Sequence, residues 1–443
     1  MSIRKLNLTI FVALLVGLVA IFAWDRLIIE RVSAEDKTVY ENLQTFSDVL
    51  DIVKENYVQE VKSEELIEGA ISGMLRTLDP HSSYLNPDAY KELQVETKGS
   101  FGGIGIEITV RDGVLTVVSP IEGTPAYELG IQAGDQILRV DGEPTKEMSL
   151  MDAVKKMRGP KGTNVVLTIM RDEFTKPQDF VITRATIAIK SVRGKTLEPG
   201  YGYIRLSQFQ SSTARDLRKE IAGLEKENKP LKGLILDLRN NPGGLLDQAV
   251  KVSDEFLNEG LIVYTGGRLK SQDMRFEAHM NTRPHAYPIV ILVNEGSASA
   301  AEIVAGALQD HKRAVIVGVK TFGKGSVQTV MPLRNGAALR LTTALYYTPS
   351  GRSIQAKGID PDIVVEKVIP VKMEDDRHGL KAIREEDLKN HMDSGQEGPA
   401  DSKTGSDQQS SVKEELAKDN QLARGLDVLR SWEILSQMKY GNQ

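Results

Sequence analysis

The spacing of apolar residues changes several times along the 443-residue chain, and each change predicts a different kind of element. An apolar run from Leu8 to Trp24 comes first, directly behind Arg4 and Lys5. Between Thr38 and Gln94, apolar residues recur at three- and four-residue intervals, which predicts helices. From Phe101 to Arg171, short apolar runs alternate with glycines, a pattern typical of a small β-rich module.

From about residue 187 to residue 365, apolar runs alternate with stretches of helical periodicity. Four runs predict strands, the last three of them buried: Tyr201–Leu206, Gly233–Leu238, Ile289–Val293 and Ala314–Val319. Helices are expected between them, over Thr213–Leu224, over Leu246–Phe256 and after Ser299. This alternation predicts a sheet covered by helices.

The C-terminal part has a different composition. Residues 393–411 are rich in Ser, Gly, Gln and Asp, which is typical of a flexible linker. From Val412 to Met438, leucines return near helical spacing, so a helix is expected there. This helix either acts as an interaction element or packs back on the core, and the sequence leaves both open.

The N-terminal apolar run reads as a signal peptide or a membrane anchor, with its positive end held in the cytoplasm. Val32-Ser33-Ala34 offers a small-residue cleavage site. The run is also about long enough to span a bilayer, which takes roughly 17–25 residues. In either case the rest of the chain is expected to be exported to the bacterial periplasm or cell envelope, anchored to the inner membrane if the segment is not cut.

Composition excludes several kinds of chemistry. The chain has no cysteine, which rules out disulfides, thiolate metal sites, a cysteine nucleophile and lipid attachment through an N-terminal cysteine. A net charge of −5 gives no electrostatic reason to expect nucleic acid as a partner. The six histidines are scattered without metal-ligand spacing. We therefore expect neither a metal nor another cofactor.

The β-rich module carries the segment Ala-Gly-Asp-Gln-Ile-Leu-Arg-Val-Asp-Gly at residues 133–142, and it resembles a PDZ domain over its whole length. The resemblance implies a carboxylate-binding loop made of Gly102, Gly103, Ile104, Gly105 and Ile106. Small residues leave backbone N–H groups free to converge on a peptide's terminal carboxylate. The adjoining strand edge then adds the peptide as an extra strand. The alternative is a glycine-rich strand entry that binds nothing.

The strongest chemical signal is a serine among small residues at a strand-to-helix turn (residues 296–303), followed by Lys324 between two glycines. A serine hydroxyl needs a base to become a nucleophile. Lysine can be that base if burial keeps its amine neutral. The residues alone leave Ser297 and Ser299 both open, because Ser297 could cap the helix whereas Ser299 lies nearer its positive end. A solvated surface lysine remains the alternative for Lys324.

These motifs resemble those of the carboxyl-terminal processing peptidases, also called tail-specific proteases. The resemblance rests on Ser-Ala-Ser-Ala at 297–300, Phe-Gly-Lys-Gly at 322–325 and a glutamine four residues after the lysine. It implies that Ser299 is the nucleophile, Lys324 the base, and Gln328 the group that orients the lysine amine. Residues 237–244 and 347–355 also look like blocks of this family.

Negative charge that develops on the substrate needs an oxyanion hole. The backbone N–H of Ala300, directly after the nucleophile, is well placed to donate. A second donor is expected from Gly243 or Gly244, where glycine permits close backbone approach. The sequence does not decide between the two glycines.

The expected fold is therefore α/β and multi-domain: an α/β protease core with an inserted PDZ-like β-rich domain, a helical N-terminal lead-in and a helical C-terminal extension. The expected domains are the signal or anchor (1–34), the helical lead-in (35–97), the PDZ domain (98–186), the protease core (187–369) and the extension with its linker and helix (370–443).

The function expected from these features is that of an exported serine endopeptidase that binds the C-terminal tails of protein substrates. The family resemblance adds an activating adaptor, homo-oligomer formation and a PDZ domain that gates the site, with Arg158 as a candidate relay. Two alternatives remain, a non-enzymatic PDZ scaffold on an inactive core and an esterase or amidase acting on small molecules. A P-loop is rejected because Gly325 stands where Ser or Thr is needed and a strand follows.

Overall fold

The computed structural model describes residues 38–280, 284–368 and 407–440. The N-terminal apolar run, its cleavage site and most of the predicted linker lie outside these residues. Among the described residues, no helix is long and apolar enough to cross a membrane. The chain divides into two compact units, Met1–Tyr84 and Leu85–Gln443.

The described part of the first unit is helical, as its periodicity predicts. A helix covers residues 38–56, and α2 follows at Ser63–Arg76. Asp79 then ends the helical pattern by accepting hydrogen bonds from the backbone N–H groups of His81 and Ser82. The short strand β1 (Ser83–Leu85) reaches the boundary of the unit.

The second unit begins with α3 (Pro87–Lys98), which Asn86 caps through its side chain. The β-rich module comes next, and its strands β3, β4, β5, β7 and β8 form one antiparallel sheet in that order. β6 pairs with β5, while β2 and β9 form a separate two-stranded ladder. The elements of the module are β2 (Ser100–Gly103), β3 (Ile106–Arg111), β4 (Val114–Pro120), α4 (Pro125–Glu128), β5 (Gln136–Val140), β6 (Glu143–Pro144), η1 (Thr145–Glu147), α5 (Leu150–Met157), β7 (Asn164–Met170), β8 (Gln178–Thr183) and β9 (Ala185–Ala188).

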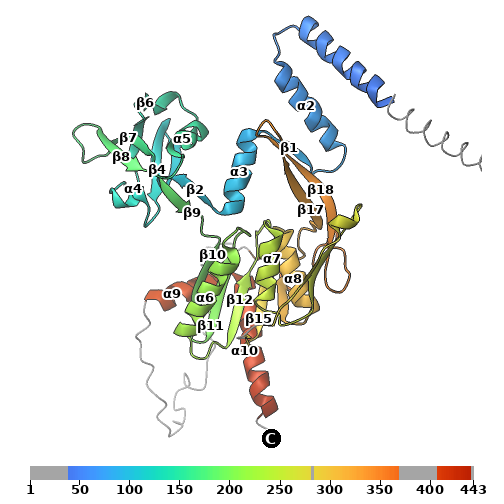
Figure 1. Cartoon of the computed structure of the whole chain (residues 1–443). Helices are drawn as coiled ribbons and strands as arrows, with labels where there is room; N and C mark the ends of the chain where they lie inside the picture. Colours follow the sequence, from blue (N-terminus) through green and yellow to red (C-terminus); the bar gives the residue numbers. More distant parts are fainter. Residues whose placement is uncertain (1–37, 281–283, 369–406, 441–443) are drawn as a thin grey trace, which may run out of the picture. The chain divides into compact units, whose positions relative to one another are not determined.

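The α/β region is a six-stranded sheet in which β10 is antiparallel and the other strands are parallel. Its strands in spatial order are β10 (Val192–Glu198), β11 (Tyr201–Leu206), β12 (Gly233–Asp237), β15 (Ile289–Val293), β16 (Ala314–Gly318) and β19 (Ile363–Val364). One face is covered by helices (Figure 1), namely α6 (Thr213–Glu227), α7 (Leu246–Asp254) and α8 (Ala300–Asp310). They pack against the sheet through a large apolar cluster. The central strands are apolar on both sides because both faces are covered.

A second antiparallel sheet joins strands that come from either side of α8 in the sequence. β18 pairs with β17 along most of its length and with β13 near its end, and β13 also pairs with β14. These elements are β13 (Leu261–Gly267), η2 (Lys270–Gln272), β14 (Arg275–Glu277), β17 (Ser326–Pro332) and β18 (Ala338–Tyr347). The sheet matters for the site because β17 carries Gln328.

The C-terminal segment forms two helices where the sequence predicts one. α9 (Asp407–Lys418) begins inside the predicted linker, and α10 (Asn420–Tyr440) follows after a break at Asp419. The Asp419 carboxylate accepts from the backbone N–H of Leu422 and forms a bidentate ion pair with Arg239 at 2.7 and 2.9 Å, which explains the break.

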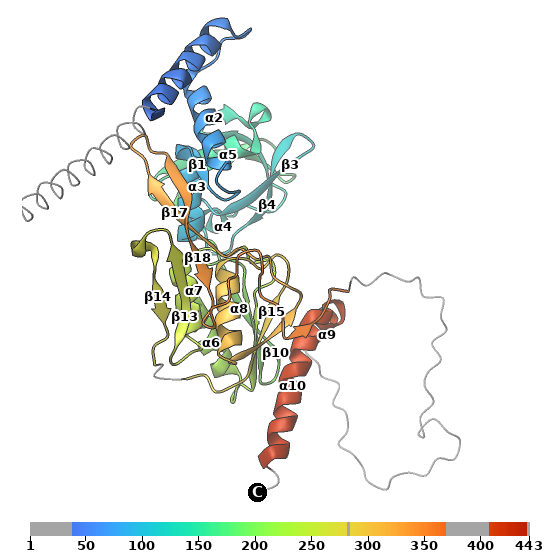
Figure 2. The same cartoon turned by 90° about the vertical axis from the view of Figure 1, so that its right-hand side faces the viewer.

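α10 packs on the face of the six-stranded sheet that the other helices leave open. Leu422, Leu426 and Leu429 are buried there against apolar side chains of the central strands. The C-terminal half of α10 extends beyond the sheet (Figure 2). Trp432, in this half, is exposed. Of the two roles that the sequence leaves open, packing on the core is the one that the first half of this helix adopts.

Because Leu426 is only 1% exposed, we expect Leu426→Ala to lower the free energy of unfolding by about 2–5 kcal/mol. Trp432→Ala on the same helix is the control, since Trp432 is 59% exposed and surface substitutions usually change stability by less than ~0.5 kcal/mol. Urea unfolding followed by circular dichroism measures both. Equal effects of the two variants would contradict the packing described here.

Candidate active site

Three neighbouring parallel strands deliver the candidate site residues to one edge of the sheet. β12 runs into the turn with Gly243 and Gly244, β15 into the turn with Ser299, and β16 into the loop with Lys324. Carboxyl ends of parallel strands meet at the same edge, where α/β folds place their ligands. Ser299, Lys324, Gln328 and Gly244 accordingly line one cavity of about 610 Å³.

The two candidate serines have different roles in the turn before α8. The Ser297 hydroxyl donates to the carbonyl oxygen of Leu238 at 2.7 Å and accepts from the backbone N–H of Asn294 at 3.0 Å. Ser297 therefore links this turn by a hydrogen bond to Leu238, the residue that directly follows β12. Ser299 lines the cavity instead, with a positive φ of 55° that a non-glycine residue rarely adopts. Such backbone strain is found preferentially at functional sites.

Lys324 is half-buried, and two effects act on its amine. Burial lowers the pKa of Lys324, and the positive charge of Arg340 lowers it further. Both effects favour the neutral amine, the form that can accept a proton. Both effects act in the direction that a lysine base would require.

Glu302, which the sequence did not single out, binds both the turn that carries Ser299 and the loop that carries Lys324. Its fully buried carboxylate accepts from the backbone N–H groups of Ser299 at 2.8 Å, Gly323 at 2.7 Å and Lys324 at 2.9 Å. It also accepts from the Thr321 hydroxyl at 2.6 Å. Burial raises the pKa of Glu302, while these four donors act in the opposite direction. The available signal was an acid three residues after a serine at the start of an apolar helix, as in a capping box.

We expect Glu302→Gln to lower kcat by about 10²-fold, because the amide nitrogen would face donors and shift the loops that carry Ser299 and Lys324. KM should change little, since Glu302 is not part of the cavity lining. Glu295→Gln, in the same turn but not buried, is the matched control. Steady-state kinetics that show equal kcat for Glu302→Gln and wild type would contradict this positioning role.

Gln328 lines the cavity together with Lys324, and its side-chain amide makes a local hydrogen bond. The side-chain nitrogen donates to Ser326, at 2.8 Å to the hydroxyl and 3.2 Å to the carbonyl oxygen. β17 is irregular between Val327 and Gln328. In this arrangement Gln328 therefore does not make the contact with the Lys324 amine that the family resemblance implies.

The two glycines after β12 differ in what they touch. A Cβ on Gly243 would lie 2.8 Å from the Ser299 Cβ and 3.0 Å from the Ala300 nitrogen, so the turn approaches Ser299 as closely as glycine allows. The Gly243 N–H donates to the Asn241 side chain at 2.9 Å. Gly244, by contrast, lines the cavity.

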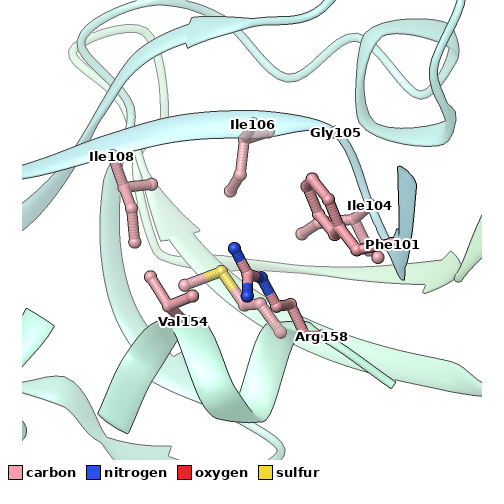
Figure 3. A pocket seen from close by; sticks show the side chains of 9 residues that line it. Phe101, Ile104, Gly105, Ile106, Ile108, Val154 and Arg158 are labelled. Atoms are coloured by element: carbon pink, nitrogen blue, oxygen red, sulfur yellow. The ribbon is translucent and has the colours of Figure 1, made fainter. Parts of the chain in front are cut away.

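The β-rich module has a pocket of about 200 Å³ between β3 and α5 (Figure 3). It is lined by Phe101, Gly103, Ile104, Gly105, Ile106, Ile108, Val154, Met157 and Arg158. Four of the five residues expected in the carboxylate-binding loop line this pocket. Gly102 does not, because it faces Gly159, whose carbonyl oxygen would lie 2.0 Å from a Cβ at this position.

Arg158 connects this pocket to α3. Its guanidinium stacks over the Phe101 ring at 4.5 Å and pairs with both carboxylate oxygens of Glu92 at 2.7 and 2.8 Å. α3 in turn contributes Leu93, Glu96 and Thr97 to the cavity that contains Ser299. One short helix therefore contacts both sites.

Comparisons with known proteins agree with this organisation. Residues 200–365 match the peptidase family S41 model, residues 92–170 the PDZ domain, and residues 23–89 the N-terminal domain of the activating protease CtpB. The carboxy-terminal-processing protease of Bartonella bacilliformis is 47% identical over 398 residues, which cover 89% of this chain and 90% of that protein. The chain belongs to the carboxyl-terminal processing peptidases.

Other members of the family are more distant. The carboxyl-terminal-processing protease of Synechocystis is 42% identical, over 71% of this chain and 75% of that protein. A solved photosystem II D1 C-terminal processing protease is 32% identical, over 73% of this chain and 93% of that one, with a TM-score of 0.43. The chain is thus a serine-type processing peptidase with a PDZ domain, and both the predicted fold class and the predicted enzyme class are confirmed.

Proposed function

We propose that this peptidase cuts protein chains by nucleophilic attack of Ser299, with Lys324 as the general base. The observation that carries the proposal is the common cavity of Ser299 and the half-buried Lys324, whose loops share the Glu302 carboxylate. The neutral amine takes the hydroxyl proton as the serine oxygen bonds to the scissile carbonyl carbon. The resulting ammonium then gives that proton to the leaving amine, and water hydrolyses the acyl-enzyme.

Ala300 and Gly244 supply the oxyanion hole in this proposal. Ala300 follows the nucleophile at the first position of α8, where N–H groups are free of helix partners. Gly244 is favoured over Gly243 as the second donor because the Gly243 N–H is engaged by Asn241 and Gly244 lines the cavity. Gly243 has a steric role instead, because its missing side chain allows the turn to approach Ser299.

The PDZ domain captures the free C-terminus of the substrate. Backbone N–H groups of the loop from Gly103 to Ile106 bind the carboxylate, and the pocket between β3 and α5 takes one apolar side chain. The aliphatic lining of Ile104, Ile106 and Ile108 supports an apolar final residue.

Peptide binding also activates the enzyme through Arg158. A substrate carboxylate in the pocket competes with Glu92 for the guanidinium, and α3 carries the change to the catalytic cavity. The side-chain amide of Gln328, bound to Ser326, supports a resting state that must rearrange. If Arg158→Ala leaves peptide-stimulated cleavage unchanged, the relay is wrong.

The N-terminal apolar run supports export to the bacterial envelope, with membrane association if it is not cut. An activating adaptor and a homo-oligomer, both implied by the family resemblance, complete the proposal.

The test is degradation by the full-length chain of an unstructured protein with an apolar C-terminus, beside the same protein with its last residue changed to Asp. Faster cleavage of the apolar substrate supports tail recognition. Equal rates contradict it. Hydrolysis of a short ester without any protein cleavage would favour the esterase alternative, and tail-peptide binding without hydrolysis the scaffold alternative.

A further inference from the structure

Arg340 lies in the catalytic cavity, although neither the motifs nor the mechanism above use it to contact the substrate. On β18 it stands directly opposite Val330 of β17, two residues beyond Gln328. Cross-strand partners share one face of a sheet, and residues two apart along a strand share it too. Arg340 is therefore on the face that carries Gln328, and it lines the same cavity as Ser299 and Lys324.

The guanidinium group of Arg340 has a hydrogen-bond donor without a partner. The Nε of Arg340 is buried without a hydrogen-bond partner, and no ion pair of Arg340 occurs in the part of the chain that the structure describes. Buried charges are ordinarily paired, and a buried donor without a partner costs about 1–3 kcal/mol. Two other arginines of this chain are paired in this way: Arg239 and Arg171 each pair with a fully buried aspartate, at 2.8 and 2.6 Å.

The charged groups around the cavity do not neutralise Arg340. Asp247 of α7 binds its own neighbours, Lys251 at 2.9 Å and Gln248 at 3.0 Å. The Glu302 carboxylate faces backbone N–H groups. Glu96 of α3 lines the same cavity without a hydrogen bond to Arg340, and Lys324 carries the same sign of charge. An unpaired cation thus faces the space where the substrate chain must lie.

We propose that Arg340 is a specificity-determining residue that binds the side-chain carboxylate of an Asp or Glu in the substrate, next to the scissile bond. The inference rests on the proposed function and adds a substrate preference to it. A carboxylate is the anion that a polypeptide substrate carries on its side chains, and the guanidinium binds it with charge-assisted hydrogen bonds. Apolar neighbours such as Val327 and Val330 strengthen the pair by excluding water.

A second consequence separates this role from simple packing. The charge of Arg340 lowers the pKa of Lys324, and a bound carboxylate would cancel that charge. The pKa of the lysine then moves back up toward its usual value, so less neutral amine is present at a given pH. Substrates with the acidic residue should bind more tightly yet reach full rate only at higher pH than their neutral counterparts.

The test uses unstructured substrates with one apolar tail that differ only in carrying Glu or Gln at a single position, scanned across the cleavage site. For one position we expect wild type to show a KM about 10-fold lower for Glu, equal to one charge-assisted pair. In the plot of cleavage rate against pH, the acid limb for the Glu substrate should also lie at higher pH than that for the Gln substrate. Arg340→Gln should erase both differences. Arg340→Lys should keep part of the KM preference, because it keeps the charge without the fork of donors.

Arg334→Gln, an exposed arginine outside the cavity, is the control and should behave as wild type. Wild type that cleaves both substrates with the same KM at every position overturns the inference but leaves the proposed function intact. A Glu preference that survives in Arg340→Gln overturns it as well. Wild type that cleaves neither substrate overturns the proposed function itself, and the inference with it. Arg340→Lys keeps the test decisive if Arg340→Gln does not fold.

Discussion

Ser299→Ala should reduce proteolysis by on the order of 10⁴-fold or more, because no other group in the cavity replaces the hydroxyl that forms the acyl-enzyme. Binding of the substrate tail should be unchanged, since the PDZ pocket contains neither Ser299 nor Lys324. The variant should also fold normally: Ser299 is 8% exposed and loses only its hydroxyl.

Ser297→Ala is the matched control for this prediction. It removes the hydrogen bonds to Leu238 and Asn294 and should cost about 1 kcal/mol of stability for each. It leaves the Ser299 hydroxyl in the cavity, so most of the activity should remain. Cleavage rates and thermal unfolding separate the two variants. A Ser297→Ala enzyme without activity but with wild-type stability would reverse the assignment of the two serines.

Lys324→Met should reduce proteolysis by a similarly large factor and at the same time raise the free energy of unfolding at neutral pH. The activity falls because the serine loses its base, and general bases contribute typically 10²–10⁴-fold. The stability rises because burial and Arg340 disfavour the ammonium, a cost that methionine does not carry. Activity and stability should therefore move in opposite directions.

The sign of the pH dependence follows from the lowered pKa. The unfolded chain binds a proton on Lys324 up to about pH 10.5, whereas the folded chain releases it at lower pH. Between the two pKa values the unfolded state holds more protons, so the free energy of unfolding increases as pH rises. Lys324→Met should lack this increase. Wild-type activity should likewise rise through the lower pKa. Lys324→Arg, which cannot lose its proton, should stay inactive at every pH; activity in that variant would contradict the base role.

The sequence predicted the sheet well because burial on both faces leaves a local pattern. Ile289–Val293 is apolar at every position, and β15 has the same bounds. The common cavity of Ser299 and Lys324 also follows from topology, since each comes after one of two adjacent parallel strands. Patterns of this kind need no information from distant parts of the chain.

The features that escaped prediction depend on distant partners. The break at Asp419 is stabilised by Arg239, 180 residues away in the sequence. The Glu302 carboxylate accepts a hydrogen bond from the backbone N–H of Gly323, 21 residues further along the chain, a contact that a capping box does not imply. None of these contacts can be read from local spacing.

The most direct test of the central claim is covalent labelling of the full-length chain with a fluorophosphonate in the presence of a tail peptide, followed by mass mapping of the adduct. We predict a single adduct on Ser299, formed faster as pH rises, and little labelling in Lys324→Met. An adduct on another residue, or equal labelling of Lys324→Met and wild type, would contradict the Ser299–Lys324 mechanism.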